Sequence, residues 1–270
     1  MRVVRLDGRP ADPGAPGLAP DDPLARAGDG LIETMRAGGG RVFRLAAHLD
    51  RMERAAAALA MRGLPTRAAC LREVAEAVAA AGDGDLRVRL CVSTRPTLWV
   101  EATPVPPLPA APAGLRAVAL PGAWVPGNAA AEHKTASRAA WAAADRRAAA
   151  AGADAALLVD RRGRMGEATV ASVLTLLGSG WVTAPVRGLL PGVGRAAVME
   201  LVPVAEHAPG RREWREAREM VLVSAAGGVR PVVAVDGLPV AGGAPGPEGR
   251  ALARAYRALV ARETGGGPAP

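Results

Sequence analysis

The chain has 270 residues, half of them hydrophobic, so it is long enough for one large domain or two of ordinary size, each with its own core. Its formal net charge of +8 comes from 34 basic and 26 acidic residues and suits an anionic partner. The arginines are scattered and aromatic residues make up 3% of the chain, which argues against nucleic acid, and no stretch approaches the roughly 20 apolar residues that span a membrane.

Hydrophobic patterning in the first part of the chain predicts strands interleaved with two helices. Strands are expected at residues 3–6, 31–36, 41–44, 86–92 and 97–102, and helices at about 47–61 and 67–81. The three glycines at 38–40 indicate a hairpin turn. The proline-rich segment 104–112 (PVPPLPAAP) follows, and because proline has no backbone N–H, it is expected to be an extended linker.

The second part of the chain again mixes both kinds of element. Strands are expected at 115–120, 155–159, 172–177, 181–183 and 220–224, a hairpin at 232–236, and helices at about 137–151, 195–202 and 248–263. This mixture predicts two α+β domains with a cleft between them. The predicted boundaries are 1–106 for a smaller N-terminal domain, 107–113 for the linker and 114–270 for a larger C-terminal domain.

Lys134 is the only lysine among the 34 basic residues, and it lies in a predicted loop. Arginine has replaced lysine wherever a positive charge was enough, so Lys134 is expected to do something that arginine cannot. An amine in a dry pocket can lose its proton and attack a carbonyl carbon, whereas a guanidinium stays protonated. The pattern therefore favours a Schiff base on Lys134. The alternative is a surface lysine that survived by chance.

Further motifs flank Lys134 in the sequence. They are residues 28–36 (GDGLIETMR) followed by 48–52 (HLDRM), residues 165–172 (MGEATVAS) and residues 190–195 (LPGVGR). Together with Lys134 and the helix-to-strand run after it, and in this order, they resemble the class IV aminotransferases. This family of fold-type IV pyridoxal 5'-phosphate (PLP) enzymes includes branched-chain and D-amino-acid aminotransferases and 4-amino-4-deoxychorismate lyase.

The resemblance covers nearly the whole chain and implies several properties. The fold is expected to be the two-domain α+β fold of the D-amino-acid aminotransferase type, with PLP in the cleft between the domains. A homodimer and a small anionic amino substrate are expected as well. Cys70 and Cys91 match no metal or redox pattern, and the N-terminus lacks the apolar core of a signal peptide, so a cytoplasmic protein with reduced thiols is expected.

The family roles fall on named residues of this chain. Lys134 is expected to be the catalytic lysine that holds PLP. The resemblance assigns Arg51 to the cofactor phosphate, which a planar guanidinium binds with two parallel hydrogen bonds. The alternative for Arg51 is a solvated arginine on a helix surface.

Glu167 stands where the family has a glutamate that pairs with the pyridine nitrogen of the cofactor. A carboxylate there keeps the ring protonated and able to accept electrons. Thr169, in the same motif, is assigned to the cofactor site too. The alternative for Glu167 is a surface ion pair with Arg161, Arg162 or Arg164.

The motif 190–195 opens a predicted helix, and the N–H groups of Val193 and Gly194 are expected to bind phosphate. The alternative is an ordinary turn. The family usually has a threonine where Gly194 stands, and hydroxyl residues near Ala225 and Ala226. Their absence implies weaker cofactor binding, and Gly194→Thr is expected to tighten it. A cofactor-free, non-enzymatic relative is a further alternative.

Two residues of the first motif bear on the reaction. Ile32 and Thr34 resemble the lyase branch of the family more than the transaminase branches, so conversion of 4-amino-4-deoxychorismate to 4-aminobenzoate and pyruvate is the first expectation. An aminotransferase is the second. Arg95 resembles a substrate-loop arginine of some transaminases, although its loop looks shortened and a surface position is the alternative. Ala226 is also assigned to the substrate side of the site.

Overall fold

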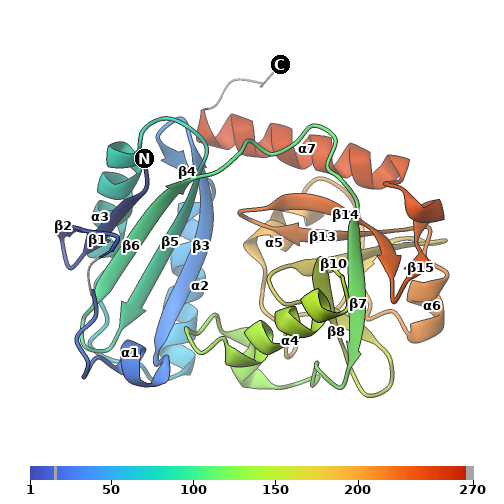
Figure 1. Cartoon of the computed structure of the whole chain (residues 1–270), viewed down its shortest axis with the longest axis horizontal. Coiled ribbons are helices and arrows are strands. Elements are labelled where there is room, and N and C mark those ends of the chain that lie inside the picture. The colour runs from blue at the N-terminus through green and yellow to red at the C-terminus, as the bar shows by residue number, and fades with distance from the viewer. Residues whose placement is uncertain (15–16, 266–270) are drawn as a thin grey trace. The chain divides into compact units, whose positions relative to one another are not determined.

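The computed structural model describes residues 1–14 and 17–265 and contains two compact units (Figure 1). The first unit comprises Met1–Pro107, His133–Arg138 and the residues from Ala258 onward, and the second comprises Leu108–Glu132 and Ala139–Arg257. The first unit thus takes in two pieces that are remote from it in sequence. One of these pieces carries Lys134.

An antiparallel sheet of six strands forms the centre of the first unit, in the order β2-β1-β6-β5-β3-β4. The strands are β1 (Val3–Leu6), β2 (Arg9–Ala11), β3 (Gly30–Gly38), β4 (Arg41–Val42), β5 (Leu86–Ser93) and β6 (Leu98–Pro104). Side chains alternate between the two faces of a strand. In β3 the core side carries Leu31, Met35 and Ala37, and the opposite side carries Ile32 and Thr34, which are half-buried.

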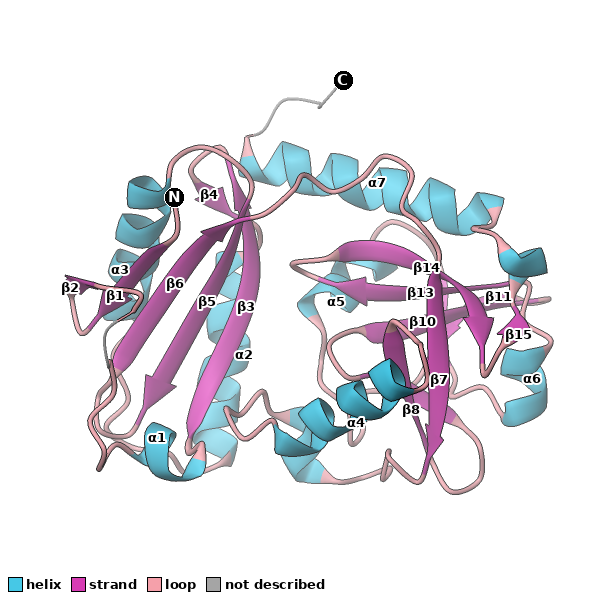
Figure 2. Cartoon of the chain, in the orientation of Figure 1, coloured by secondary structure: helices cyan, strands magenta, loops and turns pink. Residues whose placement is uncertain are grey.

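Two helices pack on one face of this sheet, α2 (Leu45–Ala58) and α3 (Arg67–Ala81), as Figure 2 shows. A short helix, α1 (Pro23–Ala27), precedes β3. Thr66 caps α3, because its hydroxyl accepts a hydrogen bond from the N–H of Ala69. Apolar residues of α2 and α3 join those of the sheet in one core, so α2 is held firmly against β3.

The second unit contains a sheet of nine strands with the path β12-β11-β10-β13-β14-β7-β8-β9. The strands are β7 (Leu115–Pro121), β8 (Ala155–Val159), β9 (Met165–Ala168), β10 (Ser172–Leu177), β11 (Gly180–Thr183), β12 (Val204–Glu206), β13 (Glu219–Ser224), β14 (Gly228–Val235) and β15 (Leu238–Pro239), which pairs with β14. Because β9 also pairs with β10 through Glu167 and Ser172, six of these strands close into a ring.

The second unit also contains four helices or parts of helices and two 3-10 turns. They are α4 (Ala139–Ala150), α5 (Val193–Met199), α6 (Arg211–Arg215) and most of α7 (Pro247–Thr264), with 3-10 turns η1 (Ala129–Glu132) and η2 (Ala241–Gly243). Of these, α4 packs on β7 and β8, and α5 packs on β13. No helix of the described residues is long and apolar enough to cross a membrane.

Most of the predicted elements are present, and the differences have simple causes. The sequence pattern did not indicate β2, β9, β12, β15, α1 and α6, which have two to five residues each, too few to display a period. The predicted helix at 195–202 begins earlier, at Val193, because Gly192 already has the extended backbone of an N-cap. Likewise β14 begins at Gly228 rather than at Val232.

Candidate functional site

Lys134 is held by its own backbone along β3. The N–H of Ile32 donates to the carbonyl of Lys134, and the N–H of Ala136 donates to the carbonyl of Gly30, each at 2.9 Å. Thr135 forms the antiparallel bridge to β3 between these two bonds. The segment therefore acts as a very short extra strand, which fixes the half-buried lysine at the beginning of β3.

A buried carboxylate, Glu33, joins β3 to α2. Nε of Arg51 donates to Oε1 of Glu33 at 2.9 Å, and Nη2 donates to Oε2, so the two side chains form a two-point ion pair. Nδ1 of His48 lies 2.7 Å from the same Oε2. We call these three residues the Glu33 cluster. His48 and Arg51 lie one helical turn apart on α2, which brings both onto the face that packs on β3.

The charges in the Glu33 cluster follow from burial and contact. Burial alone would raise the pKa of Glu33, but the hydrogen bond from His48 and the charge and hydrogen bonds of Arg51 lower it overall. Burial lowers the pKa of His48, helped by the charges of Arg51 and Lys134 and opposed by Glu33. A neutral His48 must carry its proton on Nδ1 to bond the carboxylate. Its Nε2 is then an acceptor, and it is buried with no hydrogen-bond partner in the described parts of the chain.

This donor set fits a phosphate-bearing cofactor. The carboxylate of Glu33 offsets one positive charge, while Arg51 and Lys134 supply two, and Lys134 is near enough for its charge to affect His48. A buried arginine with a half-buried lysine nearby can bind an anion such as a phosphate. Arg51 is buried, so it is not the solvated helix-surface arginine of the alternative interpretation.

Two of the predicted substrate residues, Ile32 and Thr34, share one face of the sheet. Ile32 pairs with Cys91, and Thr34 pairs with Arg89, so Arg89 lies directly beside Thr34. Arg89 is exposed, and no sequence motif marks it, because only the register of β3 and β5 brings it there. Arg95 instead lies in the exposed turn after β5, where it forms an ion pair with Asp21.

In the second unit, Glu167 lies in β9 and is buried. The alternative partner Arg164 is paired with Asp160 at 2.7 Å, so this arginine does not hold Glu167 at the surface. The hydroxyl of Thr169 donates to Asp145 of α4. Thr169 therefore ties the loop after β9 to α4, a contact that the motif did not indicate.

Gly194 lies in the first turn of α5 and packs against the turn between β13 and β14. A β-carbon at this position would lie 2.8 Å from the backbone N of Ala225 and 2.8 Å from the carbonyl carbon of Ser224. Tighter cofactor binding by Gly194→Thr was predicted for a retained family geometry. On this backbone the added side chain would meet main-chain atoms of Ser224 and Ala225, so the turn between β13 and β14 would first have to shift. Val193 is buried, and Ala226 is half-buried in the adjoining turn.

The two cysteines are unpaired and buried. Burial raises the pKa of Cys70 to about 11 and that of Cys91 to about 12, so both are protonated and unreactive at neutral pH. Cys70 lines an apolar cavity of about 290 Å³ between α2 and α3 that contains none of the predicted site residues. No group of side chains in the described residues could hold a metal ion.

Comparison with known sequences gives one family. The family model described as amino-transferase class IV matches residues 30–235. Branched-chain-amino-acid aminotransferase-like protein 2 of Arabidopsis thaliana is 27% identical over 263 residues, which cover 88% of this chain and 47% of that protein. Branched-chain-amino-acid aminotransferase-like protein 1 of the same plant is 31% identical over 120 residues, which cover 43% of this chain and 21% of that protein. The chain thus spans about half the length of the first relative and less of the second.

Comparison with solved structures indicates the same family. A hypothetical aminotransferase from Mycobacterium tuberculosis in its PLP-bound form matches with a TM-score of 0.86 and 25% identity, over 97% of this chain and 100% of that one. A fold IV-transaminase from Curtobacterium pusillum matches with a TM-score of 0.82 and 27% identity, over 97% and 98%. The predicted family and the two-domain α+β fold are confirmed, and PLP is the cofactor of the family, as predicted.

Proposed function

The chain belongs to the class IV aminotransferases, and we propose that it is a PLP-dependent aminotransferase in which Lys134 carries the cofactor. One observation carries the proposal. The only lysine of the chain is fixed by two backbone hydrogen bonds to β3, the strand whose Glu33 binds the buried Arg51. A surface lysine would not need such fixation.

Each residue has a separate task in this proposal. When bound, PLP supplies an electron sink for the electron pair that remains at Cα after the substrate loses its proton. Nζ of Lys134 takes that proton from Cα and holds it for the next step. The carboxylate of Glu167 would hold a proton on the ring nitrogen. Arg51 would bind the phosphate through Nη1, the guanidinium nitrogen that does not bond Glu33.

The substrate that fits best is a small amino acid with a second carboxylate. Arg89 is exposed and adjacent to Thr34 on the sheet face that also carries Ile32. A guanidinium there can pair with a carboxylate on the substrate side chain. We therefore expect Arg89→Ala to raise KM for dicarboxylic substrates about tenfold or more, with a smaller effect on monocarboxylic ones, since a charge-assisted hydrogen bond contributes about 1.5 to 3 kcal/mol.

The second candidate is 4-amino-4-deoxychorismate lyase. Thr34 favours it, because a hydroxyl follows the glutamate of β3 where transaminases of this family often have glycine. Thr34 is half-buried on the face that carries Ile32 and Arg89, so its hydroxyl is available on that face. The substrate of the lyase is also a small anionic amine.

Peptide mapping after borohydride reduction tests the role of Lys134. Trypsin cuts the unmodified chain after Lys134 and after Arg138, giving peptides 117–134 and 135–138. A cofactor reduced onto Nζ blocks the first cut, so a single peptide 117–138 with the added cofactor mass is expected. Labelling of the Met1 amine alone would refute the proposal.

Activity assays then distinguish the two candidates. The purified chain should convert pairs of amino acids and 2-oxo acids, with glutamate or 2-oxoglutarate as one partner. Pyruvate and 4-aminobenzoate released from 4-amino-4-deoxychorismate, without transamination, would favour the lyase. We also propose the homodimer and the cytoplasmic location implied by the resemblance; light scattering on the purified protein measures the former, and fractionation of cells measures the latter.

A further inference from the structure

Arg195, in the first turns of α5, is a buried arginine with an incomplete set of partners. Its exposed fraction is 8%, and Nη2 contacts the carbonyl of Ala184 at 3.4 Å and forms an ion pair with Glu206. Its Nε is buried and has no hydrogen-bond partner among the residues of the described structure. A buried N–H of a charged group is normally bonded to protein or to ordered water. Arg195 is the last residue of the motif 190–195, and the family resemblance assigns it no role.

Arg195 and Glu167 both line a small cavity. Its volume is about 10 Å³, close to that of one water probe, and Glu167, Ser172, Thr183 and Arg195 contribute its polar lining. Thr183 donates its proton to the carbonyl of Val173 at 2.8 Å, so its oxygen can still accept. A water needs two to four polar partners to stay ordered. The cavity therefore has both the size and the lining for one water molecule.

We propose that this cavity holds one ordered water that accepts a hydrogen bond from Nε of Arg195 and donates one to the carboxylate of Glu167. Arg195 is then a positioning residue, which fixes the orientation of Glu167 and places a buried positive charge beside it. The positioning role rests on the proposed function of Glu167, whereas the water site does not. The water would add a second polar partner to a buried guanidinium whose acid partner among residues 1–14 and 17–265 is the half-exposed Glu206.

A crystal structure at a resolution that shows waters tests the site directly, in protein without substrate. A single water is expected within hydrogen-bond distance of Nε of Arg195 and of Glu167. The variant Arg195→Met keeps most of the side-chain volume and removes the N–H, so the water should be lost or lose this contact. An empty cavity in the wild type, or a direct bond from Nε to Glu167, overturns the inference.

The positioning role is tested by titrating the absorbance band of the bound cofactor with pH. The quantity compared is the midpoint, the pH at which half of the absorbance change has occurred. Removing a buried positive charge favours the protonated form of a neighbouring base, so Arg195→Met should raise this midpoint. Glu206→Gln is the matched control, because it alters the ion pair and leaves Nε of Arg195 in place. It should leave the midpoint unchanged or lower it. A midpoint that is the same in Arg195→Met and the wild type overturns the role.

Two results separate this inference from the proposed function. A labelled Lys134 together with an empty cavity overturns only the inference about Arg195. An unlabelled Lys134 overturns the proposed function and with it the positioning role. Arg195→Lys is the second variant if Arg195→Met fails to fold, because it keeps the charge but has no N–H at Nε. It should lose the water and move the midpoint less than Arg195→Met.

Discussion

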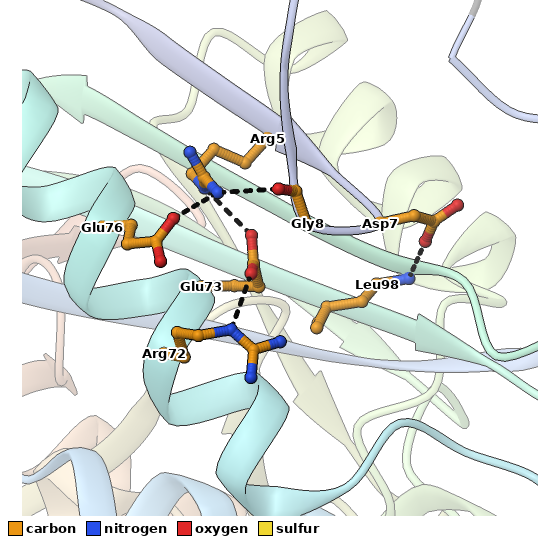
Figure 3. Close-up of polar contacts among 7 residues, drawn as sticks. All are labelled: Arg5, Asp7, Gly8, Arg72, Glu73, Glu76 and Leu98. Atoms are coloured by element: carbon orange, nitrogen blue, oxygen red, sulfur yellow. Dashed lines mark hydrogen bonds and ion pairs between the residues drawn. The ribbon is translucent and has the colours of Figure 1, made fainter.

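Two side-chain clusters in the first unit each contain a buried arginine–glutamate pair, but they differ in their other members. One is the Glu33 cluster. The other, the Glu73 cluster, consists of Arg5, Arg72, Glu73 and Glu76 (Figure 3). Nε of Arg5 donates to Glu73 at 2.9 Å, and its Nη2 donates to the carbonyl of Gly8 at 3.1 Å. The Glu73 cluster thus ties the β1–β2 turn to α3.

Charge balance distinguishes the two clusters. In the Glu73 cluster two arginines face two glutamates, and the positive and negative charges cancel. In the Glu33 cluster one carboxylate faces Arg51 with Lys134 nearby, and Nε2 of His48 has no partner in the described structure. A buried arginine–glutamate pair is common to both clusters, so it does not by itself indicate a site. The buried ring nitrogen without a hydrogen-bond partner among the described residues belongs to the Glu33 cluster and not to the Glu73 cluster.

Lys134→Arg gives the largest expected effect and tests whether charge alone defines the site. The variant keeps the positive charge, the backbone bond from Ile32 to residue 134 and the neighbouring bond from Ala136 to Gly30. Stability should change little, while turnover should fall by at least about a thousandfold, because a guanidinium cannot act as the nucleophile or base. Steady-state rates and thermal unfolding measure both. Appreciable turnover in Lys134→Arg would mean that the amine has no chemical role.

Arg51→Ala and Arg5→Ala test the comparison directly. Arg51→Ala should weaken cofactor binding by about 2 to 4 kcal/mol, the order expected when one partner of a desolvated charge pair is removed. Arg5→Ala should lower the free energy of unfolding by about 3 kcal/mol, because Glu73 stays buried with only the exposed Arg72 beside it. Cofactor titration by absorbance and urea unfolding separate these effects. Equal cofactor affinity in both variants would remove the distinction between the clusters.

The regular parts of the fold could be predicted because they have a visible period. The helix at 67–81 and the strand at 155–159 were predicted with the bounds that the structure has. The ring closure in the second unit could not be predicted, since it depends on one pairing between Glu167 and Ser172 within two short strands. Pairing between strands is a property of the backbone in space, which a period in the sequence does not report.

Candidate site residues could be proposed from the sequence where chemistry restricts the residue type. Lys134 was proposed from composition, and Arg51 and Glu167 from motifs. Arg89 was not, because only the register of β3 and β5 places it beside Thr34. The collision at Gly194 could not be predicted either, since no motif reports where the β13–β14 backbone runs.

Gly194→Thr tests whether close packing between α5 and the β13–β14 turn, rather than charge, restricts which residue position 194 can hold. The β-carbon would meet main-chain atoms of Ser224 and Ala225 at 2.8 Å, so the free energy of unfolding should fall by about 1 to 3 kcal/mol, the usual cost of overpacking. Gly178→Thr is the matched control, because nothing lies within 4 Å of its β-carbon. Thermal unfolding of both variants gives the comparison. Tighter cofactor binding by a stable Gly194→Thr would show that the turn moves aside.

The pH dependence of stability gives the smallest expected effect and tests the neutral state of His48. The pKa of His48 is lowered by burial and by the charges of Arg51 and Lys134, against the opposing effect of Glu33. As the pH falls below the ordinary value of 6.5, the unfolded chain gains a proton that the folded chain does not, so the free energy of unfolding falls.

Glu33 acts in the same direction at lower pH. Its pKa is lowered in the folded chain, so its contribution is lost only as the pH falls below its ordinary value of 4.5. His48→Asn keeps an N–H donor near Glu33 and removes the titration, so its stability should depend less on pH between about pH 7 and 5 than that of the wild type. Urea unfolding at several pH values measures the two slopes. The same slope in both proteins would mean that His48 takes up a proton in the folded state, and the Glu33 cluster would then hold still more positive charge than the Glu73 cluster.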